Sequence, residues 1–338
     1  MINTTFTVNG KVYTTEVDET QSLLTYLREE LHLYGTKNGC SGKGQCGACT
    51  VIFNGESKRA CTVKMAKVEG AVIETIENLS KGGELHPVQV GFVNTGAIQC
   101  GFCTPGMIMS AKALLDKNNN PTDQEIQTAL KTNICRCTGY VAIKDAVRMA
   151  GKIMRGEAVE YLPADGTVGT SVLSKDVVQK AMGLPIFAED REFPGMIYGK
   201  VKYTDHPSAI VKKINVEKAL AVPGVIRVLR GSDVPGRKTY GLLNPHQPIM
   251  VEEGERVRYI GDPIVTVLAD SLKAAEEAAK LVEVEYEVLP GVYSVAEALK
   301  EDRASIWNKE DVSSHTKIRR GDTDKAFEEC DVIVEGDF

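Results

Sequence analysis

Eight of the nine cysteines lie between Cys40 and Cys137, and they form two sets of four. Four thiolates are enough to hold a [2Fe–2S] cluster or to fill a structural zinc site. The sequence therefore predicts two metal centres, which either carry electrons or only stabilise the fold. The first set is Cys40, Cys46, Cys49 and Cys61, and the second is Cys100, Cys103, Cys135 and Cys137.

The loop that carries the first three cysteines is rich in glycine, with Gly39, Gly42, Gly44 and Gly47 among them. Glycine permits the positive φ angles that let a loop wrap tightly and direct backbone N–H groups toward cluster sulfurs. Plant-type [2Fe–2S] ferredoxins use a similar arrangement of three cysteines followed by a distant fourth. Zinc sites usually pair two C-x2-C units, and only half of this set has that form. The first set therefore favours an iron–sulfur cluster over zinc.

The second set has the spacing C-x2-C-x31-C-x-C, which is less diagnostic. A Cys-x-Cys pair places two sulfurs close together on one loop, and a thiolate at a helix start is stabilised by the helix dipole. Cys103 has this advantage because Thr104-Pro105-Gly106 is a good helix start, in which Thr104 can cap and Pro105 fills the first position. These residues favour a second cluster, and zinc stays the alternative.

The elements that must position the first set form a small β-rich domain over residues 1–78. Asn9-Gly10 separates two β-branched segments and is a strong signal for a type I′ hairpin. The leucines of residues 22–31 recur at helical spacing, so this helix is expected to pack one face on the hairpin. The predicted elements, in chain order, are strands over 3–9 and 11–17, a helix over 22–31, and strands over 50–53 and 71–76.

The second set lies in a segment, residues 79–155, that is predicted to be entirely helical. Thr122 and Glu125 form a capping box just after a helix break at Asn118-Asn119-Asn120-Pro121. Residues 156–180 hold proline and glycine among polar residues and are predicted to be an extended linker. From 181 to 295 the pattern becomes strand–helix–strand, with strands predicted over 209–214, 225–229, 263–269 and 282–289 and a helix over 272–281.

Composition restricts the remaining possibilities. The 338 residues are 43% hydrophobic and 25% charged with a net charge of −6, as in an ordinary globular protein, and no dense Lys/Arg run indicates nucleic-acid binding. No stretch is apolar enough for a membrane span, and the N-terminus does not resemble a signal peptide. We therefore expect a cytoplasmic protein whose cysteines are metal ligands rather than disulfides. Cys330 stands apart and is expected to be a partly buried free thiol.

Taken together, the two cysteine sets resemble one family, the molybdenum hydroxylases, which comprises xanthine dehydrogenases, aldehyde oxidases and aldehyde oxidoreductases. Residues 194–200, 222–225 and 257–263 are also similar to the α/β hammerhead that opens the molybdenum-binding part of these enzymes. The cysteine motifs that carry the resemblance are Gly39-Cys40, Gln45-Cys46-Gly47-Ala48-Cys49-Thr50, Gln99-Cys100-Gly101-Phe102-Cys103-Thr104-Pro105-Gly106 and Cys135-Arg136-Cys137-Thr138-Gly139-Tyr140.

The resemblance implies an α+β multidomain fold in which each cysteine set binds one [2Fe–2S] cluster. It also implies that Gln99 and Cys137 lie against the pterin of the molybdenum cofactor. The likeness is closest to flavin-free bacterial aldehyde oxidoreductases, because only a linker stands where other members have a FAD domain. The implied parts are a β-grasp ferredoxin-like domain (1–78), a four-helix cluster domain (79–155), the linker (156–180), the hammerhead (181–295) and the start of a molybdenum-binding domain (296–338).

The function implied by the resemblance is electron transfer from a molybdenum–pterin centre through the two clusters to a flavodoxin or ferredoxin. The family's catalytic glutamate has no counterpart here, so no catalytic residue is assigned. The chain is expected to be the N-terminal part of a longer enzyme. Its expected partners are the remaining molybdenum-domain polypeptide and a second copy in a homodimer. Neither nucleic acid nor a membrane is an expected partner. The alternatives are a xanthine, purine or other N-heterocycle dehydrogenase of the same family and a stand-alone two-cluster electron carrier.

One departure from the family pattern concerns the first cysteine pair. The family usually has four residues between these cysteines, whereas Cys40 and Cys46 enclose five. Because glycines flank the extra residue, we expect it to be absorbed as a local bulge and the cluster still to form.

Overall fold

The first sheet begins with the predicted hairpin. In the computed structural model, which describes residues 1–163, 165–242, 245–307 and 315–336, β1 (Ile2–Val8) pairs antiparallel with β2 (Lys11–Val17). Asn9 and Gly10 take the φ angles of 52° and 81° that a type I′ turn requires. The prediction of a hairpin at Asn9-Gly10 is therefore confirmed.

Three further strands complete a five-stranded sheet of order β2-β1-β5-β3-β4. Two of them match the predicted strands, and β4 was not predicted because its residues are all polar and do not alternate. A second hairpin at Asn54-Gly55 joins β3 to β4 and places Phe53 opposite Glu56. The bounds are β3 (Thr50–Phe53), β4 (Glu56–Arg59) and β5 (Val72–Glu74).

The predicted helix over 22–31 packs on this sheet, but it is not a regular α-helix. One α-helical turn, α1 (Leu23–Thr25), is followed by the π-helical segment η1 (Tyr26–Glu30). The buried side chains of α1 and η1 pack against the sheet. The ring of Tyr26 lies edge-on to that of Phe6, with 5.5 Å between their centroids. Short 3-10 turns follow as η2 (Ala60–Thr62), η3 (Met65–Lys67) and η4 (Ile76–Asn78).

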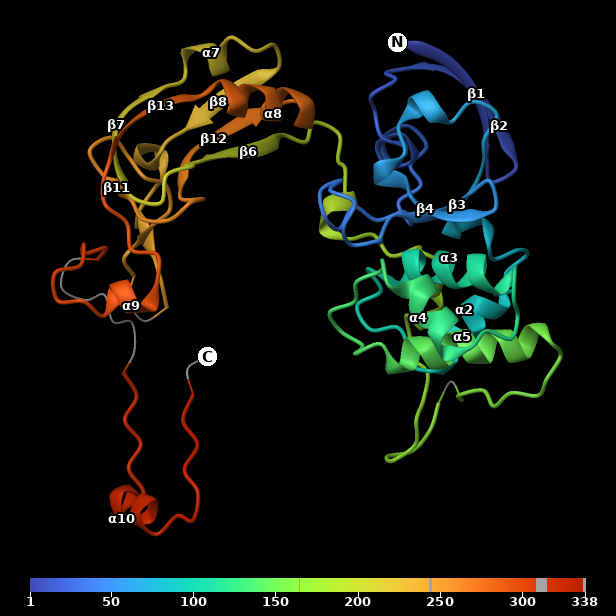
Figure 1. Cartoon of the computed structure of the whole chain (residues 1–338). Helices are drawn as coiled ribbons and strands as arrows, with labels where there is room; N and C mark the ends of the chain where they lie inside the picture. The colour runs from blue at the N-terminus through green and yellow to red at the C-terminus, as the bar shows by residue number, and fades with distance from the viewer. Residues whose placement is uncertain (164, 243–244, 308–314, 337–338) are drawn as a thin grey trace. The chain divides into compact units, whose positions relative to one another are not determined.

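Four helices follow, as predicted: α2 (Pro87–Asn94), α3 (Thr104–Leu115), α4 (Asp123–Leu130) and α5 (Val141–Met154). The capping box is confirmed, since Thr122 and Glu125 exchange hydrogen bonds at the start of α4. The expected cap at Thr104 is wrong: Cys103 occupies that position, with its carbonyl accepting from the Met107 amide at 3.1 Å. Figure 1 shows α3 next to β3, so the helices also touch the sheet.

The segment predicted as an extended linker ends in a short helix, α6 (Val177–Ala181). The prediction was wrong for its last residues because Val177 and Ala181, four positions apart, are buried against the core of the four helices. The turn η5 (Ala188–Asp190) follows. Contacts divide the chain after it, into a first unit Met1–Arg191 and a second unit Glu192–Phe338.

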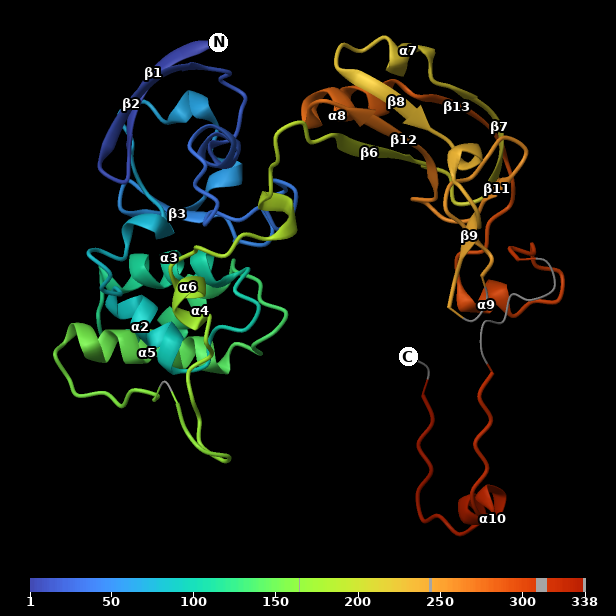
Figure 2. The same cartoon turned by 180° about the vertical axis from the view of Figure 1, so that it is seen from behind.

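The second unit contains two three-stranded sheets, of order β6-β12-β8 and β11-β7-β13. The predicted helix is present as α8 (Leu272–Leu281), and its alanines pack against β6, β12 and β8 (Figure 2). Strand β6 was not predicted because Gly199 and two lysines weaken its pattern. The strands of the two sheets are β6 (Tyr198–Tyr203), β7 (Ala209–Asn215), β8 (Val225–Leu229), β11 (Arg256–Val257), β12 (Pro263–Ala269) and β13 (Glu283–Val288).

The remaining elements of the second unit are short. Cys330 follows the last helix and is exposed, so the expectation that it is partly buried was wrong. None of the described helices combines the length and apolar character that crossing a bilayer requires. The short elements are α7 (Glu217–Leu220), η6 (Gly231–Asp233), β9 (Thr239–Tyr240), β10 (Gln247–Pro248), α9 (Val295–Ala298) and α10 (Thr323–Glu328).

The packing of α2 on α5 depends on a residue without a side chain. A Cβ placed on Gly91 would overlap the carbonyl oxygen of Ala146 in α5. We expect Gly91→Ala to lower the free energy of unfolding by about 1–3 kcal/mol, because backbone atoms cannot move aside as a side chain can. Chemical denaturation measures this change. Gly199→Ala is the control, since its added Cβ would meet the nearest atom at an ordinary 3.6 Å, and an equal loss in both variants would contradict the prediction.

Candidate functional site

The first cysteine set is assembled from a loop and a 3-10 turn. Cys40, Cys46 and Cys49 lie on the loop before β3, and η2 brings in Cys61 from the far end of the β3–β4 hairpin. Cys49 and Cys61 are buried, whereas Cys40 and Cys46 are partly exposed. The thiols interact in two pairs, Cys40 with Cys46 and Cys49 with Cys61. The structure thus brings together all four residues of the predicted set.

The loop follows a path that most residues cannot take. Ser41, Gly42, Gly44 and Gly47 all have φ angles between 51° and 74°, in the left-handed region. The Asn38 side-chain carbonyl accepts from the Gly42 amide at 3.0 Å, which closes the turn that contains the extra residue. Between Cys40 and Cys46 the left-handed residues are Ser41, Gly42 and Gly44. That these residues absorb the extra length as a bulge stays a prediction.

This path directs backbone amides at the Cys40 sulfur. The Gln45 amide donates to Cys40 Sγ at 3.4 Å. Burial raises the pKa of Cys40, but hydrogen bonds from this amide and from that of Cys46 more than offset burial and bring the pKa to about 7. Cys49 differs, because its burial raises its pKa to about 12.

The second cysteine set lies between two helix starts. Cys100 and Cys103 precede α3, and Cys135 and Cys137 lie on the loop between α4 and α5. The Sγ atoms of Cys100 and Cys137 are 3.7 Å apart, and the Cys103 thiol is paired with that of Cys135. Cys100 and Cys137 are exposed and Cys135 is buried. The structure again brings the four predicted residues together as two pairs.

The pairing of the thiols bears on the kind of metal centre. In a [2Fe–2S] cluster held by four cysteines the thiolates are shared between two irons, whereas a structural zinc ion gathers all four round one centre. In the first set, four thiols lie close together and a backbone amide donates to one of the sulfurs. This donor chemistry fits a [2Fe–2S] cluster, whose sulfur ligands accept such hydrogen bonds.

Thr138 and Tyr140 support Cys135; both belong to the last cysteine motif, but the motif did not indicate these roles. The Thr138 hydroxyl donates to Cys135 Sγ at 3.2 Å, and the Tyr140 hydroxyl accepts from the Cys135 amide at 2.9 Å. Burial raises the pKa of Cys135, but the hydrogen bonds from Thr138 outweigh it and the pKa is lowered. Tyr140 has a φ of 71°, which is uncommon for a bulky residue and serves to turn its ring back toward Cys135.

The two sets are joined by direct contacts between their loops. The Ile134 amide donates to the Cys46 carbonyl at 2.9 Å, and the buried Asn133 side chain donates to the Gly47 carbonyl at 2.9 Å. Ser110 of α3 orients Asn133 by donating to its carbonyl oxygen at 2.8 Å. The sequence did not indicate Asn133, because an asparagine in a short loop is usually a turn residue.

Gln99 and Cys137, the residues expected to face a pterin, are both exposed. The Gln99 carbonyl accepts from the Lys180 ammonium at 2.8 Å, so its backbone is held by α6. The structure thus leaves the two side chains open on the surface of the first unit, at the same cysteine set.

Three family models match the chain. A 2Fe-2S iron-sulfur cluster binding domain matches residues 6–74, and a second [2Fe-2S] binding domain matches residues 75–148. The a/b hammerhead domain of aldehyde oxidase and xanthine dehydrogenase matches residues 182–290. The chain therefore carries two [2Fe–2S]-binding domains followed by a hammerhead.

Known proteins resemble the chain over its whole length or over the cysteine sets. It is 37% identical over 366 residues to the aldehyde oxidoreductase of Megalodesulfovibrio gigas, covering 100% of this chain and 40% of that protein. It is 47% identical over 143 residues to the nicotinate dehydrogenase small FeS subunit of Eubacterium barkeri, covering 42% of this chain and 90% of that subunit. The solved aldehyde oxidoreductase of Desulfovibrio gigas matches with a TM-score of 0.87 and 35% identity, over 99% of this chain and 39% of that one.

The contrast between Cys40 and Cys49 leads to a test on reduced, metal-free protein. Because thiolates react and thiols do not, Cys40 should be alkylated with a midpoint near its pKa of about 7, and Cys49, with a pKa of about 12, should resist. Mass spectrometry after iodoacetamide treatment from about pH 6 to about pH 9 measures this difference. The exposed Cys330 controls for reagent activity, and equal labelling of Cys40 and Cys49 at neutral pH would refute the assignment.

Proposed function

This chain belongs to the xanthine dehydrogenase and aldehyde oxidase family of molybdenum hydroxylases, and we propose that it is the iron–sulfur electron-transfer portion of an aldehyde oxidoreductase. The observation that carries this proposal is the presence, in one compact unit, of two four-thiol sites whose loops touch. The chain spans less than half the length of the aldehyde oxidoreductase that it matches, so hydroxylation would need further polypeptide.

We propose that each set of thiols holds one cluster. The pairing suggests that Cys40 and Cys46 bind one iron of the first cluster, and Cys49 and Cys61 the other. The pairs of the second cluster would be Cys100 with Cys137 and Cys103 with Cys135. Bound there, the clusters would accept and release single electrons. The amides and the Thr138 hydroxyl that donate to cysteine sulfurs would stabilise the negative charge and tune the potentials.

Exposure of the two sets suggests the direction of electron flow. The exposed side of the second set, with Gln99 and Cys137, would face the pterin of a molybdenum cofactor held by the rest of the enzyme. The first set has its own exposed rim, which includes Ser41, Lys43 and Gln45. An external acceptor such as a flavodoxin or a ferredoxin would approach that rim. We further propose that the enzyme is cytoplasmic, forms a homodimer and does not bind a membrane.

The preferred substrate class is aldehydes, because an aldehyde oxidoreductase matches the whole chain at 37% identity, whereas a probable hypoxanthine oxidase of Escherichia coli matches 98% of the chain at 28% identity. The likeness to a nicotinate dehydrogenase subunit supports a second candidate, an enzyme that hydroxylates N-heterocycles. Hydroxylation assays on the complete enzyme, with an aldehyde and with nicotinate or a purine as substrate, separate the two candidates.

Metal content tests the proposed ligands. Purified anaerobically, the protein should contain about four irons and about four inorganic sulfides, which two [2Fe–2S] clusters require. Cys103→Ala should reduce the iron to about two per chain because it removes one ligand of the second cluster. Elemental analysis and visible absorption measure both quantities. Cys330→Ala is the matched control and should keep all its iron; a zinc-containing, colourless wild-type protein would disprove the proposed function.

A further inference from the structure

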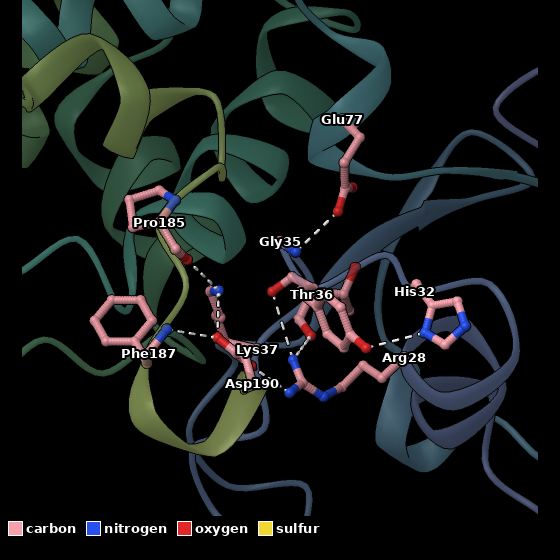
Figure 3. A network of polar contacts seen from close by, with 10 residues as sticks. Arg28, His32, Gly35, Thr36, Lys37, Glu77, Pro185, Phe187 and Asp190 are labelled. Carbon is pink, nitrogen blue, oxygen red and sulfur yellow. Dashed lines mark hydrogen bonds and ion pairs between the residues drawn. The ribbon is translucent and has the colours of Figure 1, made fainter. Parts of the chain in front are cut away.

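Lys37 is fully buried and lies three residues before Cys40. Its ammonium donates to the carbonyl of Pro185 at 2.9 Å and to Asp190 Oδ2 at 3.1 Å (Figure 3). A buried cation is tolerated only with a counter-charge and satisfied hydrogen bonds. Pro185 and Asp190 both lie in the segment after α6. They are 148 and 153 positions after Lys37 in the sequence.

Asp190 is equally buried and has other partners besides Lys37. Its carboxylate accepts from the Arg28 guanidinium and from the Phe187 amide, the latter at 2.9 Å. Arg28 also donates to the Thr36 carbonyl at 3.0 Å, next to Lys37. Burial raises the pKa of Asp190, but Arg28, the Phe187 amide and Lys37 outweigh burial and lower it, so the carboxylate is ionised at neutral pH.

The same segment is bound at its other end to the helical part of the unit. The Ala181 carbonyl accepts from the buried Gln89 side chain at 3.0 Å. Lys180 donates to the Gln99 carbonyl, and its aliphatic carbons cover Gly101, where an added Cβ would come within 2.8 Å of them. We refer to residues 177–190 as the strap, because they run from the loop of the second cysteine set to the loop of the first.

An aromatic contact links the strap to both loops. Phe187 meets Phe102 edge-on at 5.1 Å between centroids, and the Lys37 ammonium lies 4.8 Å from the Phe187 ring. Phe102 stands between Cys100 and Cys103 and reaches across to the first loop. A Cβ on Gly39 would lie 3.0 Å from the Phe102 ring and 3.1 Å from Cys46 Sγ.

We propose that the strap fixes the two cluster loops relative to one another, and that Asp190 is the positioning residue that holds it. This inference rests on the proposed function, since it assumes a cluster in each set. Without the carboxylate, Lys37 and Arg28 lose the anion that binds both of them, and the strap loses its attachment to the first loop. Phe187 then no longer supports Phe102 against Gly39.

Asp190→Asn in the full chain tests the proposal, with Asp176→Asn as the matched control. Asp176 lies just before the strap and pairs with Lys180 on the surface. We expect Asp190→Asn to release iron from the first set to a chelator about ten-fold faster, because the loop before Cys40 loses its attachment to the strap; loss of supporting hydrogen bonds around metal sites lowers metal affinity by about this factor or more. The electron paramagnetic resonance spectrum of the reduced first cluster should change, together with its magnetic interaction with the second. Asp190→Glu, which keeps the charge, should restore part of both.

Phe187→Leu provides an independent variant if Asp190→Asn does not fold. It keeps the ion pairs and an apolar side chain, so iron content should stay at the wild-type level while the magnetic interaction between the reduced clusters changes. Wild-type rates and spectra in both variants would overturn the role of the strap and leave the proposed function standing. A wild-type protein without clusters would overturn both, so the two failures are distinguishable.

Discussion

The structure depends on holding four thiols close together at each of two sites. Sulfurs that carry negative charge repel one another and lose water when buried, so each site needs donors from the protein. In the first set the donors are backbone amides, and they reach Cys40 only because the loop passes through consecutive left-handed residues. In the second set, the Thr138 hydroxyl provides a donor from a side chain. Two different local solutions therefore meet the same electrostatic requirement.

The contact between the loops makes the metal sites and the helix packing depend on one another. Gly106 in the first turn of α3 lies so close to the carbonyl of Gly47 that a Cβ at this position would overlap it. Asn133 binds the same carbonyl from the other side and is itself oriented by α3 through Ser110. A shift of α3 would therefore move both loops together. The relative placement of the two sites therefore depends on the same helix.

The extra residue between Cys40 and Cys46 is placed where it disturbs these contacts least. Ser41, Gly42 and Lys43 are exposed, whereas Gly47, Ala48 and Cys49 are buried. The additional length thus projects outward on the rim of the first loop, and the buried half that meets α3 and Asn133 is unaffected. The rim is also where we propose that an electron acceptor binds, so the insertion changes the surface of the site more than its interior.

Features set by neighbouring residues could be predicted from the sequence. Asn9-Gly10 specifies a hairpin and Thr122 with Glu125 specifies a helix start, because turns and caps form within a few residues. The four thiols of each predicted set also lie near one another in the structure, and their role as cluster ligands stays a prediction. The family resemblance extended this to the order of the domains, in agreement with the three family models.

Only the tertiary structure decided which thiols pair, where β4 and α6 form, and what Lys37 binds. The polar strand β4 forms because β3 offers it an edge, and α6 forms because the helical core buries Val177 and Ala181. Lys37 meets Asp190 across 153 positions of sequence, and neither residue carries a local signal of the other. The sequence by itself determined the two candidate sets of thiols and the local turns, because these are set by residues a few positions apart or by a motif. The contacts that hold the two sites together depend on long-range packing, which no short pattern records.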